Sequence, residues 1–75
     1  MAAKAFVLIE TAVGKTRDVT NALKQLEEVK SVDAVTGPYD VIAVIERESQ
    51  ADIGDLVTSK IHSVPGISRT VTCLA

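Results

Sequence analysis

The segment Thr36-Gly37-Pro38-Tyr39-Asp40 contains the residues of this chain that are best suited to binding chemistry. Gly37 and Pro38 favour a four-residue turn with Tyr39 and Asp40, and Asp40 can cap such a turn. Asp40 also begins a strongly apolar run, where a carboxylate needs a partner because an isolated buried charge is costly. A cationic group of a ligand would be one such partner, so the segment has both a structural and a binding interpretation.

A second group of polar side chains, Ser68, Thr70 and Thr72, recurs at every second position near the C-terminus. In a strand this spacing places the three hydroxyls on one face, where they form a polar edge or donate to a carboxylate. A zwitterionic amino acid needs a carboxylate for its ammonium group and donors for its own carboxylate. Asp40 suits the first need, and Thr70, Thr72 and the backbone near Gly37 suit the second.

The other reactive or ligating side chains form no recognisable site. Gly14-Lys15-Thr16 lies where a phosphate-binding loop would sit, but Ile9 stands where that motif requires a glycine. His62, the only histidine, has no evident partner in the sequence. The single cysteine, Cys73, excludes an internal disulfide and a cysteine-based zinc cage. We therefore expect no catalytic residue, metal ion or cofactor.

Length and composition narrow the function classes further. Seventy-five residues predict one domain over residues 1–75 and argue against a two-domain enzyme. Acidic and basic residues are mixed, and the only aromatic residues are one Phe and one Tyr, so direct nucleic-acid binding is not expected. No apolar segment reaches the ~20 residues of a membrane span, and the single cysteine fits a cytoplasmic protein.

Apolar runs rich in β-branched residues predict strands over residues 4–12, 30–37, 40–48 and 67–75. With a helix in each long connection, the order is βαββαβ. This order predicts an α+β fold, the ferredoxin-like plait, with both helices on one face of a four-stranded antiparallel sheet. The first and third strands are central and apolar on both faces. We expect a second copy to cover the free face, which gives a homodimer.

Two amphipathic helices are predicted between these strands. The first has an apolar face formed by Val19, Ala22, Leu23, Leu26 and Val29. Thr16 or Asp18 is its expected N-cap. The second begins with Ser49 and Asp52 at the spacing of a capping box. Its apolar face is formed by Ile53, Leu56, Val57 and Ile61.

The run VTGPYDVIAVIE, residues 35–46, resembles the V-T-G-x-Y-D segment of the Lrp/AsnC (leucine-responsive and asparagine regulator) family. The ending PGISRTVTCLA resembles the end of the same effector module, the RAM domain. The resemblance implies the plait described above, dimerisation through the sheet, and assembly of dimers into octamers or decamers. It also implies that an amino acid or related metabolite binds between dimers. The ligand-binding residues that it implies are Gly37, Tyr39, Asp40, Thr70 and Thr72.

Members of this family usually carry an N-terminal helix-turn-helix domain, whereas this chain begins at the first strand of the effector module. The expectation is a stand-alone RAM domain or an excised fragment. It would be a non-enzymatic amino acid sensor that acts on transcription indirectly, through mixed assembly with full-length Lrp/AsnC regulators. Two alternatives stay open. One is a small dimeric plait enzyme of the isomerase or monooxygenase type, with His62, Tyr39 or Asp40 in one cavity, and the other is a ligand-free oligomerisation scaffold.

Overall fold

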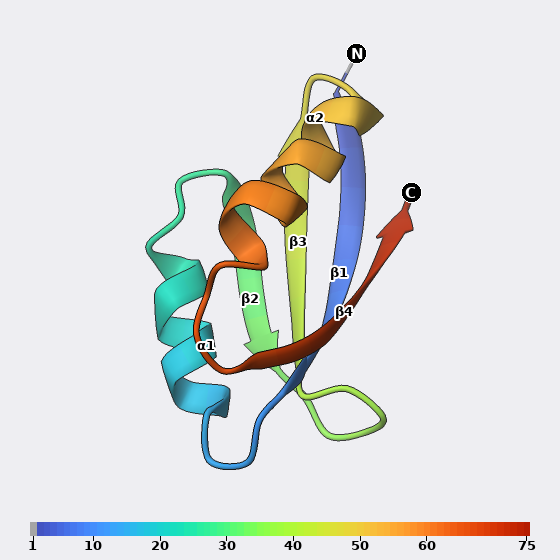
Figure 1. Ribbon diagram of the computed structural model, residues 1–75. Helices are drawn as coiled ribbons and strands as arrows, with labels where there is room; N and C mark the ends of the chain where they lie inside the picture. The colour runs from blue at the N-terminus through green and yellow to red at the C-terminus, as the bar shows by residue number, and fades with distance from the viewer. Residues whose placement is uncertain (1) are drawn as a thin grey trace.

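The computed structural model describes residues 2–75, and its four antiparallel strands follow the order β2-β3-β1-β4. The elements along the chain are β1 (Ala3–Thr11), α1 (Thr16–Lys24), β2 (Val29–Ala34), β3 (Val41–Arg47), α2 (Gln50–Leu56), the π-helical turn η1 (Val57–Ile61) and β4 (Ile67–Leu74). Both helices lie on one face of the sheet (Figure 1). The structure thus confirms the predicted βαββαβ plait with β1 and β3 at its centre.

The two faces of the central strands differ in what covers them. The face toward the helices consists of fully buried side chains: Ala5, Val7, Ile9, Val41, Ala43 and Ile45. The alternate residues form a second apolar surface, here called the open face: Phe6, Leu8, Ile42, Val44 and Val71. Phe6 is 38% exposed and Val71 36% exposed in the single chain. The prediction that both faces of the central strands are apolar is therefore confirmed.

Helix α1 is shorter than the sequence pattern predicts. Its N-cap is Lys15, which makes no side-chain capping bond, so the assignment of Thr16 or Asp18 to this position was wrong. The Thr16 hydroxyl instead shares a 2.8 Å hydrogen bond with the Thr11 hydroxyl. The helix ends at Lys24, and Val29 lies in β2 rather than on the helix. Leu26 and Val29 still pack against the core, but they do so from outside the helix.

The second helix follows its predicted pattern more closely. The Ser49 hydroxyl accepts a hydrogen bond from the Asp52 N–H at 3.2 Å, which confirms the predicted cap. The predicted apolar face is buried throughout, and it is formed by Ile53, Leu56, Val57 and Ile61.

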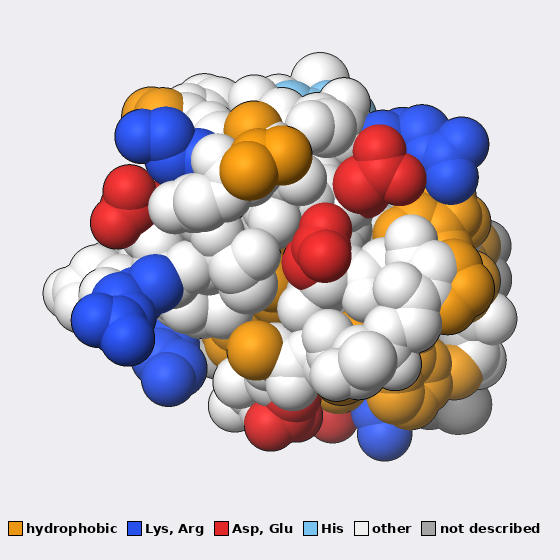
Figure 2. Space-filling model, turned by 90° about the horizontal axis from the view of Figure 1, so that it is seen from below, with side chains coloured by type: hydrophobic (Ala, Val, Ile, Leu, Met, Phe, Trp, Pro, Cys, Tyr) orange, Lys and Arg blue, Asp and Glu red, His pale blue; other side chains and the backbone are white. Residues whose placement is uncertain are grey.

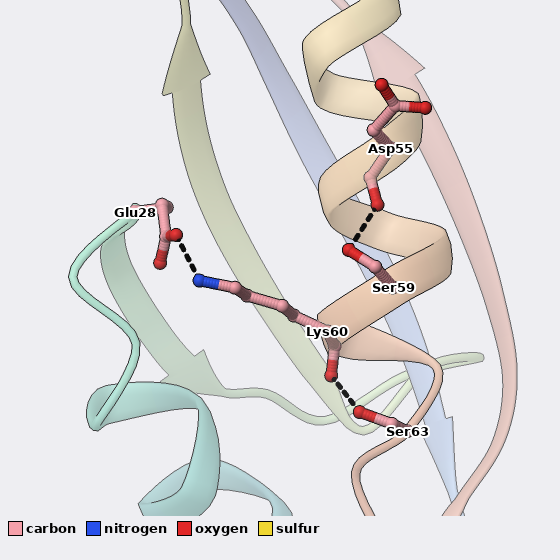
Figure 3. Close-up of polar contacts among 5 residues, drawn as sticks. All are labelled: Glu28, Asp55, Ser59, Lys60 and Ser63. Carbon is pink, nitrogen blue, oxygen red and sulfur yellow. Dashed lines mark hydrogen bonds and ion pairs between the residues drawn. The ribbon is translucent and has the colours of Figure 1, made fainter.

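The helical ladder widens at η1, where the His62 N–H donates to the Val57 carbonyl at 2.9 Å. Two serine hydroxyls donate to nearby backbone carbonyls in this stretch, Ser59 to Asp55 at 2.6 Å and Ser63 to Lys60 at 2.8 Å (Figure 3). Such side-chain bonds offer the backbone an alternative to the regular ladder. The wide turn ends with the His62 side chain within hydrogen-bonding distance of β4.

Candidate ligand-binding site

The β2–β3 loop, residues 35–40, lies at the same end of the molecule as the β1–α1 loop (Figure 1). The Val35 N–H donates to the Asp40 carbonyl at 2.9 Å, so the loop closes more widely than the predicted four-residue turn from Gly37 to Asp40. Gly37 is exposed, and no heavy atom outside its chain neighbours lies within 4 Å of the position a Cβ would take. Gly37 therefore lies at an open point of the loop.

Asp40 joins the start of β3 to the end of β1. Its N–H donates to the Ile9 carbonyl at 2.9 Å, and its Oδ2 accepts a hydrogen bond from the Thr11 N–H at 2.8 Å. Thr11 lies where β1 shifts register against β4, so the carboxylate satisfies backbone at an irregular point of the sheet. The partner expected for this carboxylate is thus partly supplied by the protein. Within residues 2–75 its other oxygen, Oδ1, accepts no hydrogen bond.

Tyr39 contacts β4 through Arg69, a residue that the sequence did not single out. Arg69 Nη2 donates to the Tyr39 hydroxyl oxygen at 3.0 Å, and the guanidinium carbon lies 5.6 Å from the ring centroid. This separation falls within the usual range of a cation–π contact. Tyr39 is half-buried and Arg69 is exposed. The Tyr39–Arg69 contact connects the β2–β3 loop to the edge strand β4.

Thr70 contacts His62, for which the sequence indicated no partner. His62 Nε2 lies 2.8 Å from Thr70 Oγ1, and the hydrogen bond connects the residue after η1 with β4. Thr70 pairs with Ile9 and Thr72 pairs with Val7. Because those partners are buried under the helices, both threonines lie on the helix-facing side of β4. Their predicted common face is observed.

Ser68 departs from that alternation. Glu10 pairs with Arg69 and Thr11 pairs with Ile67, so Ser68 has no partner on β1. A residue left out of the ladder in this way is a β-bulge, which bends the strand and re-aims its side chains. The period of two predicted for Ser68, Thr70 and Thr72 therefore holds only for the two threonines.

An open hollow of about 360 Å³ lies along this part of β4. Its lining consists of His62, Ile67, Ser68, Arg69 and Thr70. Of the residues named for the enzymatic alternative, this hollow includes His62 but neither Tyr39 nor Asp40. Figure 2 views the molecule from the loop end, where hydrophobic side chains gather along one side and charges of both signs are spread over the remainder.

The five residues expected from the sequence do not meet in one place. Val41, which follows Asp40, and Thr70 both pair with Ile9, so β3 and β4 flank β1 at this level. Two strand spacings separate them, about 10 Å. The Asp40 carboxylate itself reaches β1, where its Oδ2 lies 2.8 Å from the Thr11 nitrogen, and of the five residues only Thr70 lines the hollow on β4. One protomer therefore presents two parts of a site rather than a closed pocket.

The described residues hold no group of three or more His, Cys, Asp or Glu side chains that could ligate a metal ion. No helix in residues 2–75 is long and apolar enough to cross a membrane.

Comparison of the sequence with known proteins agrees with the resemblance to the Lrp/AsnC family. A model of the Lrp/AsnC ligand binding domain matches residues 4–75. The HTH-type transcriptional regulator FL11 of Pyrococcus abyssi is 31% identical over 70 residues, which are 93% of this chain and 46% of that protein. The chain thus spans about half the length of the curated relatives it matches.

Two solved structures resemble the chain over most of their own length. The crystal structure of FFRP-DM1 has 38% sequence identity and a TM-score of 0.91, and the match covers 97% of both chains. The crystal structure of TTHA0845 from Thermus thermophilus has 37% identity and a TM-score of 0.91, covering 97% of this chain and 91% of that one.

Proposed function

Because the chain belongs to the Lrp/AsnC ligand-binding domain family, we propose that it is a non-enzymatic, homo-oligomeric sensor of an amino acid or a related small metabolite. Its curated relatives are named transcriptional regulators, so the response to the ligand would act on transcription. In this proposal residues 1–75 form one effector-binding domain that works in the cytoplasm. It reaches DNA indirectly, by assembling with full-length regulators of the same family.

The observation that carries the proposal is the placement of complementary polar groups at one end of the sheet. Asp40 offers an oxygen that accepts no hydrogen bond within residues 2–75, which suits an ammonium group. Thr70 and Thr72 share one side of β4, which suits a carboxylate. Of the five candidate residues only Thr70 lines the open hollow on β4, so in this proposal groups from neighbouring protomers would enclose the ligand.

The open face supports the dimer within this proposal. Phe6 lies opposite Val44 and Leu8 lies opposite Ile42, so the apolar side chains form one continuous surface across β1 and β3. Val71 extends that surface onto β4. A two-fold axis would pair this surface with its own copy and remove both from water.

Ligand binding would then act on the assembly. A molecule that bridges two dimers binds the larger oligomer and not the separate dimers, so by mass action it favours the larger oligomer. Octamers or decamers are the expected products, and mixed assemblies with longer regulators would form through the same contacts.

A thermal-shift screen against the twenty amino acids tests the proposal. A ligand at 100 times its Kd stabilises by about 2.7 kcal/mol, and a domain of this size gains roughly 4–8 °C per kcal/mol. Asp40→Asn should abolish the shift, because it removes the charge and keeps an oxygen for the Thr11 N–H. Thr72→Ala should weaken it, whereas Asp55→Asn, on an exposed turn of α2, should not.

Two outcomes would contradict the proposal. Wild-type affinity in Asp40→Asn and Thr72→Ala would show that the ligand binds elsewhere. No shift with any amino acid would favour the ligand-free scaffold.

A further inference from the structure

The hollow along β4 is rich in hydrogen-bond donors. Its lining residues include two that carry hydroxyls, Ser68 and Thr70, together with Arg69, His62 and the apolar Ile67. Asp and Glu are missing from this lining. A concave surface with hydroxyl donors and one fixed positive charge favours a compact anion with several oxygen atoms.

The bulge at Ser68 explains how neighbouring side chains come to share this hollow. In a regular strand, consecutive residues point to opposite faces. Here residues 67–70 all line the same concavity, and Ser68 is the residue left without a partner on β1. The irregular backbone at a sheet edge thus brings an arginine and two hydroxyl-bearing residues to the wall of one space.

Arg69 carries the only full positive charge fixed in the lining, and that charge is not neutralised by a contact. Within residues 2–75 it forms no ion pair, although Glu10 is its cross-strand neighbour. The Tyr39 hydroxyl accepts one of its N–H groups and holds the guanidinium near the β2–β3 loop. The planar guanidinium has five N–H donors and matches a carboxylate in a two-point contact. Tyr39 is thus a positioning residue for Arg69.

We propose that the hollow is the subsite for the carboxylate of the ligand and that Arg69 is its principal recognition residue. Ser68 and Thr70 would donate the supporting hydrogen bonds, and the bond between His62 and Thr70 would fix the threonine side chain. The inference rests on the proposed function for the identity of the ligand as an amino acid. The affinity of the hollow for a carboxylate does not depend on that identity.

The first experiment compares an amino acid with its carboxamide, which keeps the ammonium group and lacks the carboxylate. Calorimetry on the intact chain measures the affinity of both for wild type, Arg69→Gln, Arg69→Lys and the control Arg17→Gln, which changes an exposed arginine on α1. Arg69→Gln should weaken amino acid binding about 10- to 100-fold, the scale of a charged hydrogen-bonded contact. Arg69→Lys should fall between, and Arg17→Gln should match wild type.

The carboxamide separates recognition from general damage. It should bind weakly to wild type and equally weakly to Arg69→Gln, because the group that Arg69 recognises is already absent. Wild-type affinity for the amino acid in Arg69→Gln would overturn the inference. An equal loss for the amino acid and the carboxamide would also overturn it. Because Arg69 is exposed, all variants are expected to unfold near the wild-type Tm.

The second experiment tests the hollow without an amino acid. Sodium acetate and inorganic phosphate are titrated separately while the backbone amide signals of Ser68, Arg69 and Thr70 are followed by NMR. Saturable shifts with acetate, lost in Arg69→Gln and kept in Arg17→Gln, would support the inference. Tighter, Arg69-dependent binding of phosphate would assign the hollow to a phosphate group and overturn the carboxylate assignment.

The two experiments distinguish the inference from the proposed function. If no amino acid binds but acetate binds in an Arg69-dependent manner, the sensor proposal fails and the carboxylate subsite stands. If an amino acid binds through Asp40 but neither its affinity nor acetate binding depends on Arg69, the sensor proposal stands and the subsite is overturned.

Discussion

The two faces of the sheet are made from similar residues and reach different environments. Ile45 on the covered side of β3 is fully buried, whereas Ile42 on the same strand belongs to the open face and is only partly buried. The difference arises from the connections and not from the composition. Each βαβ crossover is right-handed, so both helices must lie on one side. Folding of one chain therefore covers one apolar face and leaves the other uncovered, which is the face that we propose a second copy covers.

The candidate polar residues do not lie at the centre of either face of the sheet. Tyr39, Asp40 and Arg69 lie where strands β1, β3 and β4 meet the loops, and Thr70 lies on the sheet edge. These places permit a ligand to bind without disturbing the covered core or the surface assigned to the dimer. The residues of the core, those proposed for the dimer and those proposed for binding are thus separate sets, and substitutions can distinguish their roles.

The largest difference is expected between Ile45→Ala and Ile42→Ala. Ile45→Ala leaves a cavity in the covered core and should lower the free energy of unfolding by about 2–5 kcal/mol. Ile42→Ala should cost about 1 kcal/mol or less in the single chain, because its side chain is not enclosed there. Urea denaturation at several protein concentrations measures both effects.

The same measurement tests the assignment of the open face to a dimer. The wild-type midpoint should rise with protein concentration, and Ile42→Ala should reduce that rise while Ile45→Ala preserves it. Equal losses of stability in the two variants would contradict the difference between the faces. A wild-type midpoint that does not change with concentration would contradict the dimer.

A smaller loss of stability is expected from Gly66→Ala, because neighbouring side chains on the covered side occupy the space that an added Cβ would need. Gly66 has a φ of +98°, and an added Cβ would lie 2.9 Å from Lys15 Cβ and 3.2 Å from Val19 Cγ2. Its carbonyl also accepts a 2.7 Å hydrogen bond from the Ala12 N–H. Strain and overpacking together should make Gly66→Ala about 2–3 kcal/mol less stable.

Gly54→Ala is the matched control for this substitution. Gly54 lies in α2 with no heavy atom within 4 Å of an added Cβ, so the change should stabilise by up to about 1 kcal/mol. Thermal unfolding of both variants gives the comparison. If Gly66→Ala is tolerated as well as Gly54→Ala, the close fit between α1 and the segment before β4 is not a constraint.

Local patterns in the sequence predict the strands and the second helix well, because their apolar residues and the Ser49 cap act over a few positions. The end of α1 is harder to predict. The helical spacing continues through Leu26 to Val29, although the helix ends at Lys24. These two residues reach the core from a turn and from β2, and that outcome is decided by tertiary packing.

The site was predictable in part. The sequence identified Tyr39 and Asp40 as unusual, but their partners lie 30 and 29 positions away, at Arg69 and Thr11. Such pairs depend on how strands align across the sheet, which no local spacing encodes. Arg69 is the single arginine of β4. Its relevance to the site becomes clear only when the fold places β4 beside β1. Ligand binding by Gly37, Tyr39, Asp40, Thr70 and Thr72 stays a prediction.

The smallest effect is expected from the ion pair between Glu28 and Lys60, which joins the connection before β2 to η1 above the covered face (Figure 3). The hydrogen bond from Lys60 lowers the pKa of Glu28 below its ordinary value of 4.5, with support from its own backbone N–H and from the charge of Arg47. Because the folded-state pKa is lowered, the pair stabilises above about pH 4.5 and this contribution is lost as the pH falls through the folded-state pKa.

Glu28→Gln should therefore lower the Tm slightly at pH 7, and the difference from wild type should shrink as the pH falls through the lowered pKa of Glu28. Glu27→Gln, at the exposed neighbouring position, controls for the general loss of an acidic group. Calorimetric scans of the three proteins between pH 3 and pH 7 give the comparison. A Glu28→Gln effect that does not change with pH would show that the side chain acts through packing. A negligible effect at every pH would show that apolar burial alone holds the helical layer on the covered face, the same force that we propose pairs the open face with a second copy.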